Sequence, residues 1–167
     1  MKMIATATLV TSLFAAPAIG AEATAQVSDA AGNDLGTVTV RDTPSGMAHV
    51  ILDLQNLADG TRAIHLHETG DCSAGDFSSA GGHIAGDRSH GVMAEDGPHP
   101  GDMPNVTIGS DLTLAAEVFL PDLTVEQMMD DDGAAFIMHD GEDDYESQPS
   151  GDAGDRIACG AFEASGQ

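Results

Sequence analysis

The sequence has few basic side chains, and this shortage restricts what the chain can bind. Five Lys and Arg residues stand against 28 Asp and Glu residues, which gives a formal net charge of −23. The only lysine is Lys2, so a chain that loses its first residues keeps arginines alone. Because so acidic a surface repels phosphate, we expect binding neither to nucleic acid nor to anionic membranes. We interpret the acidity as a feature that keeps the protein soluble, for example in a salty habitat.

Long apolar runs are also missing, apart from one short run at the N-terminus. Lys2 precedes the apolar run Ile4–Ala18, and small residues follow it as far as Ala21. This order is typical of a secretory signal peptide, and the run is too short to span a bilayer. The alternative is a frayed first helix of the folded protein. We predict a signal peptide over residues 1–21 and one domain over residues 22–167, about 146 residues long.

Cysteine is scarce, and the two that are present suggest a covalent link. Cys72 and Cys159 are the only cysteines in the chain. In an exported protein such a pair predicts one disulfide, with two free buried thiols as the alternative. The loop it would close is long, so the chain-entropy model assigns it about 4–5 kcal/mol.

No convincing amphipathic helix, internal repeat or second domain can be found, and no glycine cluster forms a dinucleotide-binding turn or a P-loop. Short β-type runs alternate with turn residues instead. The expected strands are Ala23–Val27, Leu35–Val40, Met47–Leu54, Ala63–His67, Leu112–Phe119, Ala134–His139 and Ile157–Phe162. The segment Leu120–Met129 is a less certain connection that holds a short strand or a turn. About eight short strands predict an all-β protein, an antiparallel Greek-key flattened barrel or sandwich.

Alternation along the strands predicts which side chains face the core. In Met47–Leu54 it places His49 on the outer face, as a surface residue. In Leu112–Phe119 it places Leu112, Leu114, Ala116 and Val118 on one face. Two stretches without periodicity, residues 68–105 and 140–155, are long for loops and need something to hold them in place. Metal ligands and the disulfide would do so.

Histidine supplies the strongest functional signal. Side chains at His65 and His67 leave one face of a strand about 6–7 Å apart, and two imidazoles so placed can hold one metal ion. Half-buried polar residues on a strand are the alternative interpretation. Further donors follow in glycine-rich or acidic stretches, namely His83, His90, His99, Asp102 and His139. Taken one at a time, each loop histidine could equally be an ordinary surface residue.

This donor set favours particular metals. Imidazole suits copper, zinc, nickel and iron, and a histidine and carboxylate set without thiolate suits zinc or copper(II). The donors outnumber the four of one tetrahedral site, so we expect two metal ions that share a ligand. His83 is the best candidate for the bridge, because it lies between the His65 and His67 pair and the remaining loop donors.

Four segments also carry a resemblance to a known family. They are Ile64–Ser73 (IHLHETGDCS), Ser79–His83 (SAGGH), Gly97–Asn105 (GPHPGDMPN) and Gly151–Gly160 (GDAGDRIACG). In this order and spacing they resemble copper/zinc superoxide dismutase of the exported bacterial type, from about Ala23 to Phe162. The resemblance implies a sandwich fold and a periplasmic location. It also implies dismutation of superoxide to oxygen and hydrogen peroxide by a redox-cycling copper, bridged to a structural zinc through one histidine.

The same resemblance implies roles for individual residues. Copper would be bound by His65, His67, His83 and His139, and zinc by His83, His90, His99 and Asp102. Arg156 would hold the incoming anion, His83 would pass a proton to peroxide, and Asp143 would link ligands of both metals by hydrogen bonds. Cys72 and Cys159 match the family disulfide. One departure concerns zinc: His83 and His90 are seven positions apart, one or two fewer than is common in the family.

Two other functions compete with the enzyme, and charge raises a question about its rate. The first is a non-catalytic periplasmic copper- and zinc-binding protein, and the second is an immunoglobulin-like adhesion domain with surface histidines. Superoxide is an anion, whereas the 140–155 loop before Arg156 carries seven acids. We expect overall repulsion to oppose focusing of the substrate and added salt to relieve it. Whether the chain forms a homodimer is left open by the sequence.

Overall fold

The computed structural model describes residues 20–165, and nearly all of the predicted signal peptide lies outside them. Nine strands account for most of the regular structure, together with one short α-helix and one 3₁₀ turn. In chain order they are β1 (Glu22–Asp29), β2 (Asp34–Asp42), β3 (Ala48–Leu54), β4 (Gly60–Arg62), β5 (Ile64–His67), η1 (Ser78–Ala80), β6 (Val106–Ile108), β7 (Leu114–Leu120), α1 (Val125–Met128), β8 (Ala135–His139) and β9 (Arg156–Ala164).

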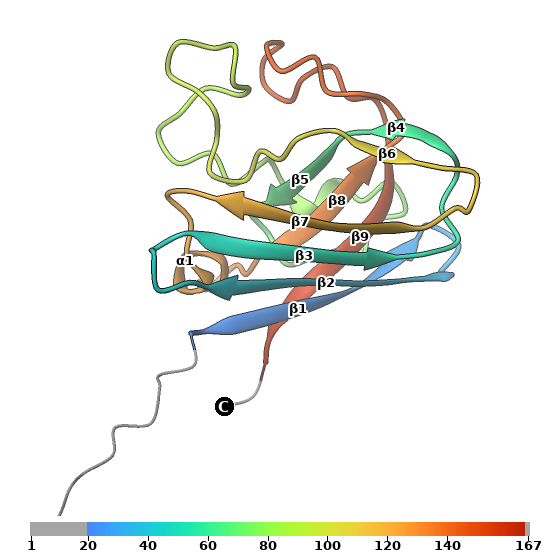
Figure 1. Cartoon of the computed structure of the whole chain (residues 1–167), viewed down its shortest axis with the longest axis horizontal. Helices are drawn as coiled ribbons and strands as arrows, with labels where there is room; N and C mark the ends of the chain where they lie inside the picture. Colours follow the sequence, from blue (N-terminus) through green and yellow to red (C-terminus); the bar gives the residue numbers. More distant parts are fainter. Residues whose placement is uncertain (1–19, 166–167) are drawn as a thin grey trace, which may run out of the picture.

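Seven strands form one antiparallel sheet in the order β5-β8-β9-β1-β2-β3-β7, and β4 pairs with β6 in a small second ladder. The sheet curls, so that β9, β8 and β5 cross behind β1, β2, β3 and β7 (Figure 1). The pairs β9 with β1, β3 with β7 and β5 with β8 join strands that are not consecutive in the chain. The predicted antiparallel Greek-key all-β fold is therefore confirmed.

Alternating side chains build the core between the two walls of this curled sheet. Val38, Val50 and Leu52 come from one wall, and Leu66 and Phe136 come from the other. All are at most 1% exposed. A smaller cluster on the other face of β8 holds Ile137 under residues of the 68–105 loop. As a result β8 is buried on both faces, which fixes the position of His139 at its end.

Strands β1 and β2 form a hairpin, since they pair with each other across the turn at residues 30–33. Asp29 stabilises that turn by accepting hydrogen bonds from the amides of Ala31 and Asn33, both at 2.9 Å. The uncertain connection Leu120–Met129 contains the single helical turn α1, which begins with a capping box made by Thr124 and Gln127. Such reciprocal side-chain bonds satisfy amides at the start of a helix that otherwise lack partners.

Three details differ from the sequence predictions. Strands β4 and β6 were not predicted, because three residues are too few to show an alternating pattern. Leu112 does not share a strand face with Leu114: it lies in the turn before β7, with φ 59° and 42% of its surface exposed. His49 is on the outer face as predicted, yet it is only 7% exposed. It stacks on Phe119 at 4.6 Å and contacts Arg41 and Glu117, which cover it.

The two long loops, residues 68–105 and 140–155, lie on the same side of the barrel (Figure 1). The disulfide between Cys72 and Cys159 is confirmed, with Cα atoms 5.9 Å apart, and it ties the first loop to β9. Side chains also join the two loops to each other, because Asn105 and the main chain of Asp143 exchange two hydrogen bonds of 2.8 and 2.9 Å. The loops are thus parts of one structure above the end of the barrel.

Candidate metal centre

Strand β5 places the first two histidines and also gathers the others. It is an edge strand of the seven-stranded sheet, so one side of its main chain is free to pair with a loop. Leu66 donates to the Gly101 carbonyl and accepts from the Ile84 amide, both at 2.9 Å. Isolated β-bridges follow, from His65 to Asp102 and from His67 to His83. The 83–102 segment is thereby held alongside β5, with its donors next to His65 and His67.

Four histidines form the first cluster, His65, His67, His83 and His139, and all are buried. One ring nitrogen of each lies within 4.8 Å of those of the other three. The rings of His65 and His83 stack with centroids 4.0 Å apart, and those of His65 and His139 meet edge-on at 5.1 Å. β5, β8 and the first long loop together supply this cluster.

Each histidine of this cluster has one nitrogen with a partner and one without. The partners are Asp143 for His65 Nε2 (2.8 Å), the Gly81 carbonyl for His67 Nδ1 (3.1 Å), Asp102 for His83 Nδ1 (2.9 Å) and the Gly154 carbonyl for His139 Nδ1 (3.2 Å). The opposite nitrogens, His65 Nδ1 and the Nε2 atoms of His67, His83 and His139, are buried with no hydrogen-bond partner. A buried polar atom without a partner is costly, so four in one place require a common ligand.

The protonation state suits such a ligand. Burial lowers the pKa of His65 and of His139 to about 4, and that of His67 further. The rings are therefore neutral at ordinary pH, and the partner of one nitrogen selects the tautomer that leaves a lone pair on the other. Neutral imidazole with an outer hydrogen bond is the form in which histidine binds copper or zinc. The cluster fits a metal ion with nitrogen ligands.

A second cluster surrounds the carboxylate of Asp102. It lies 2.9 Å from His83 Nδ1, 3.1 Å from His90 Nδ1 and 3.3 Å from His99 Nδ1. Burial alone would raise the pKa of Asp102, but hydrogen bonds from His83 and from the Gly91 amide outweigh it, so the pKa is lowered. Asp102 is thus a carboxylate among three imidazoles, a donor set that suits zinc.

The two clusters share His83, as the sequence predicted. In the second cluster, one donor atom each of His83, His90, Asp102 and also His65 lies within 4.8 Å of the others. His99 falls outside that grouping, although its ring lies 5.5 Å from that of His90 and its Nδ1 is buried without a hydrogen bond. The short His83 to His90 spacing does not keep the two rings apart, since their centroids are 5.2 Å from each other.

Asp143 connects the two clusters through hydrogen bonds to one histidine of each. Its Oδ2 lies 2.8 Å from His65 Nε2 and its Oδ1 lies 3.0 Å from His90 Nε2. Burial would raise its pKa, yet hydrogen bonds from the two imidazoles and from the Tyr145 amide lower it to about 2. An ionised Asp143 therefore accepts from both rings and orients both.

Arg156 lies beside the four-histidine cluster. Its two terminal nitrogens donate to the carbonyls of Phe77 and Gly81, both at 2.7 Å. The Gly81 carbonyl also contacts His67, so the arginine and this histidine share one anchor. Burial lowers the pKa of Arg156, but an arginine stays charged at any physiological pH. One fixed positive charge therefore lies next to the unpartnered nitrogens.

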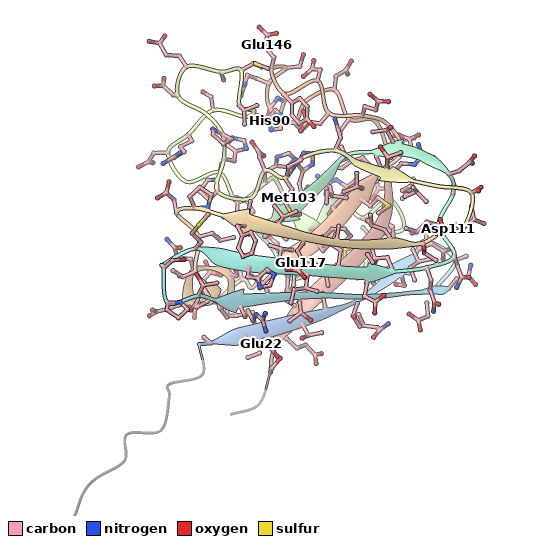
Figure 2. All side chains as sticks on the ribbon, in the orientation of Figure 1. Glu22, His90, Met103, Asp111, Glu117 and Glu146 are labelled. Atoms are coloured by element: carbon pink, nitrogen blue, oxygen red, sulfur yellow. A yellow bond between two sulfur atoms is a disulfide. The ribbon has the colours of Figure 1, made fainter. Side chains whose placement is uncertain are left out.

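The structure places the nominated histidines, Asp102, Asp143 and Arg156 in or beside the two clusters, and it adds several residues that the sequence did not indicate. Asn105, Tyr145 and Gln148 hold the loops through hydrogen bonds to main-chain atoms. Polar loop residues of this kind have no pattern in one sequence that separates them from solvent-exposed neighbours. Figure 2 shows His90 between the two loops and Glu146 at their outer edge.

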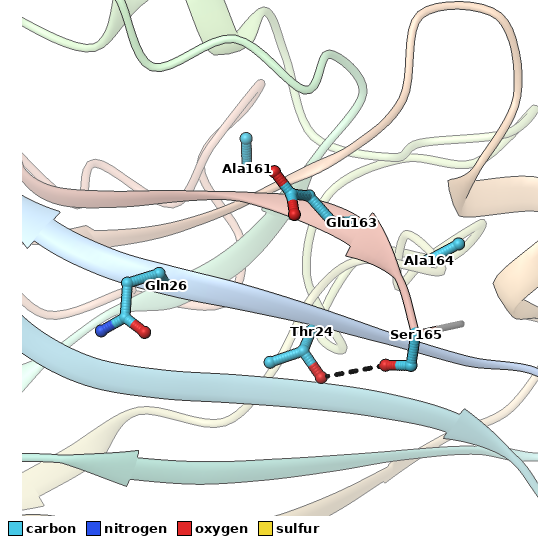
Figure 3. Close-up of a pocket in the computed structure, with 6 residues that line it drawn as sticks. All are labelled: Thr24, Gln26, Ala161, Glu163, Ala164 and Ser165. Atoms are coloured by element: carbon cyan, nitrogen blue, oxygen red, sulfur yellow. Dashed lines mark hydrogen bonds between the residues drawn. The ribbon is translucent and has the colours of Figure 1, made fainter. Parts of the chain in front are cut away.

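A separate hollow lies on the barrel wall and takes no part in either cluster. It has a volume of about 440 Å³ and is lined by Thr24, Gln26, Ala161, Glu163, Ala164 and Ser165 (Figure 3). Glu163 is its only ionisable side chain, and no histidine lines it. Its residues offer no set of donors for a metal ion.

Comparisons with known proteins agree with the geometry. Residues 35–162 match the family model described as copper/zinc superoxide dismutase. A superoxide dismutase [Cu-Zn] from Caulobacter vibrioides is 38% identical over 148 residues, covering 84% of each chain. The structure of a SOD-like protein from Bacillus subtilis aligns with a TM-score of 0.78 and 32% identity, covering 83% of this chain and 96% of that one. The Cu/Zn superoxide dismutase from Brucella abortus aligns with a TM-score of 0.70 and 26% identity, covering 85% of this chain and 99% of that one.

Proposed function

The chain belongs to the copper/zinc superoxide dismutase family, and we propose from this premise which of its residues carry the activity. The activity is the dismutation of superoxide to oxygen and hydrogen peroxide, with copper and zinc as cofactors. The observation that supports our assignment most directly is the set of four buried imidazole nitrogens that share one point and have no partner.

We assign copper to His65 Nδ1 and to the Nε2 atoms of His67, His83 and His139. When bound, copper supplies the one-electron redox chemistry, and zinc supplies a redox-silent positive charge. We assign zinc to the Nδ1 atoms of His83, His90 and His99 and to Asp102. His83 is then the shared ligand, because Nε2 faces one cluster and Nδ1 faces the other.

Arg156 and His83 handle the substrate and its proton in this proposal. The guanidinium of Arg156 is held by the Phe77 and Gly81 carbonyls, so it can orient an anion without moving. His83 Nε2, when copper does not occupy it, is the atom at which the chain would hold a proton for the peroxide product. Asp143 keeps His65 and His90 in one tautomer and one orientation.

The alternative of a non-catalytic copper- and zinc-binding protein is not favoured. Such a protein could lose the anion-binding arginine or one copper ligand without penalty. Here both the full four-histidine cluster and Arg156 are present and buried or half-buried at the same place. An adhesion domain would have no use for buried, unpartnered imidazoles.

We also propose that residues 1–21 are a signal peptide, that 22–167 are the mature enzyme and that it works in the periplasm. Two observations support this: a disulfide requires an oxidising compartment, and β1 begins directly after the proposed cleavage site, at Glu22. Among residues 20–165, no helix has the length and hydrophobicity needed to cross a membrane. The sequence leaves open whether the chain forms a homodimer, and sedimentation analysis of the mature protein would decide it.

Metal analysis combined with a superoxide-decay assay tests the assignment. The mature protein should hold one copper and one zinc per chain and should be active. His139→Ala should lose copper and activity but keep zinc, whereas Asp102→Ala should lose zinc first. Copper-loaded but inactive wild-type protein would contradict the proposal.

A further inference from the structure

A side chain of the second long loop holds the main chain of His90 in the first. His90 lies in neither a helix nor a strand. Within residues 20–165, neither its amide nor its carbonyl has a main-chain partner. Both are satisfied by the amide group of Gln148: Oε1 accepts from the His90 amide at 2.9 Å, and Nε2 donates to the His90 carbonyl at 2.9 Å. A paired contact of this kind fixes direction as well as distance.

Gln148 is itself held firmly by its own loop. Its Nε2 also donates to the Glu146 carbonyl at 2.9 Å. The carboxylate of Asp144 accepts from the amides of Glu146 and Ser147 at 2.9 and 2.8 Å, and the Ser147 carbonyl accepts from the Gly151 amide at 2.7 Å. These bonds hold the main chain on either side of Gln148, and the bond to Glu146 adds a second acceptor for its side-chain amide.

The ring of His90 has little freedom once its main chain is fixed. The ring is fully buried, with Nδ1 at 3.1 Å from Asp102 and Nε2 at 3.0 Å from Asp143. A shift of the His90 main chain would move the ring relative to both carboxylates, because the ring follows its Cα atom. Ligand rings held by outer hydrogen bonds are the ones that bind metal tightly.

We propose that Gln148 is a positioning residue for zinc, which sets the direction of the His90 ring by clamping the His90 main chain. This inference rests on the proposed assignment of His90 to the zinc site. It means that the acidic loop, which supplies none of the four proposed zinc ligands, contributes to zinc affinity. Copper should be affected much less, because none of its four proposed ligands is bonded to Gln148.

The variant Gln148→Met tests the proposal, since methionine has a similar length and cannot make either hydrogen bond. We expect its zinc dissociation constant, measured on metal-free mature protein by competition with a chromophoric chelator, to rise by about 10- to 100-fold. The visible spectrum of the Co²⁺-loaded zinc site should change, and copper affinity should stay within about threefold. Gln26→Met is the matched control, because Gln26 also makes two side-chain hydrogen bonds, to Asp34 and the Gly36 carbonyl, but on β1.

The variant His90→Ala separates two hypotheses, the assignment of His90 to zinc and the positioning role of Gln148. If it leaves zinc affinity unchanged, the assignment of His90 to zinc is wrong. If it weakens zinc binding while Gln148→Met binds zinc and Co²⁺ as the wild type does, the positioning role alone is wrong. Hydrogen exchange of the His90 amide in the metal-free wild type gives a test that needs no variant. We expect that amide to be protected, and rapid exchange would overturn the clamp.

Discussion

The carbonyl of Gly81 is a small feature on which two functional side chains depend. It accepts from Arg156 at 2.7 Å and lies 3.1 Å from His67 Nδ1. A bond from His67 Nδ1 leaves Nε2 of that ring as the lone-pair nitrogen, and a bond from Arg156 keeps the cation beside the same ring. One backbone atom thus fixes the proposed copper ligand and the proposed anion-binding group relative to each other.

Replacing Arg156 should reduce the rate with superoxide while leaving the metals in place. We expect Arg156→Met to lower kcat/KM by about tenfold or more, because the fixed charge that orients the anion is gone. The kcat/KM of Arg156→Lys should lie between those of Arg156→Met and the wild type. One ammonium keeps the charge but cannot reproduce the planar fork that reaches both carbonyls. Pulse radiolysis, with copper and zinc content measured on the same samples, provides the comparison.

Arg41→Met is the control for this experiment. Arg41 is on β2 and bonds to His49 on the outer face of the sheet, so removing it changes net charge by the same amount. Its rate should stay near that of the wild type. An equal loss in both variants would mean that overall charge, and not the position of Arg156, determines the rate.

At the scale of elements, the 140–155 loop packs so closely on the site that it tolerates no extra atom at Gly151. This glycine has φ +73°, and a Cβ atom there would collide with the Asp143 carboxylate and come within 2.7 Å of His90 Nε2. At Gly151 the main chain of the loop therefore lies so close to His90 that no Cβ atom fits between them. Glycine is required for two reasons, the left-handed conformation and the space.

Gly151→Ala should destabilise the protein more than the backbone conformation alone explains. Gly46 provides the comparison, since it has φ +84° in the β2 to β3 turn and no atom within 4 Å of the added Cβ. We expect Gly46→Ala to lower the free energy of unfolding by about 1 kcal/mol, from the left-handed backbone alone. Gly151→Ala adds about 1–3 kcal/mol from overpacking and should also weaken zinc binding. Urea unfolding of the metal-free proteins measures the difference, and equal losses would show that the loop moves aside easily.

At the scale of the whole molecule, the buried histidines make stability depend on pH. Burial holds the pKa of His65 and His139 near 4, whereas the unfolded chain has values near 6.5. Between these values the unfolded state binds more protons, so the free energy of unfolding of the metal-free protein falls as pH falls from about 6.5 to 4. One group shifted this far accounts for roughly 3 kcal/mol.

Urea midpoints measured at several pH values check this expectation. The loss should begin below about pH 6.5, well before Asp102 and Asp143 lose their charge, because the pKa of each carboxyl is lowered. Protein loaded with copper and zinc should keep its stability to lower pH, since bound metal competes with protons for the same nitrogens. A metal-free midpoint that stays level down to pH 4.5 would contradict the assignment of neutral rings.

The charge of the molecule should also affect the reaction rate. Six of the seven acids in the 140–155 loop are exposed, and Asp143 alone is buried. Elsewhere Arg88 is paired with Asp122 at 2.7 Å, which leaves little positive potential to attract superoxide. Salt screens such repulsion over about 10 Å at 0.1 M, so kcat/KM should rise or stay level as salt is added.

Rates measured from low to moderate ionic strength, together with Glu142→Gln and Glu146→Gln, test this effect. Both side chains are exposed acids of the loop, so each variant should be faster at low salt and less sensitive to salt. A steep fall in the wild-type rate with added salt would mean that attraction dominates after all.

Much of the fold and of the donor set could be predicted from local sequence. Alternation in Met47–Leu54 and in Ile64–His67 determines which side chains face the core, because side chains of a strand point alternately to its two faces. The motifs around His83 and Asp102 indicated candidate ligands, which the structure brings into two clusters. The same reasoning failed at Leu112, where a turn replaces the expected strand, and at the three-residue strand β6.

What the tertiary structure alone decided is how donors far apart in the chain meet. The free edge of β5 pairs with the 83–102 segment, Asp143 reaches from the second loop to His65 and His90, and Gln148 clamps the His90 main chain. These contacts join residues up to 78 positions apart. No local pattern encodes them, because they arise only when the sheet closes and leaves main-chain groups of the loops in need of partners.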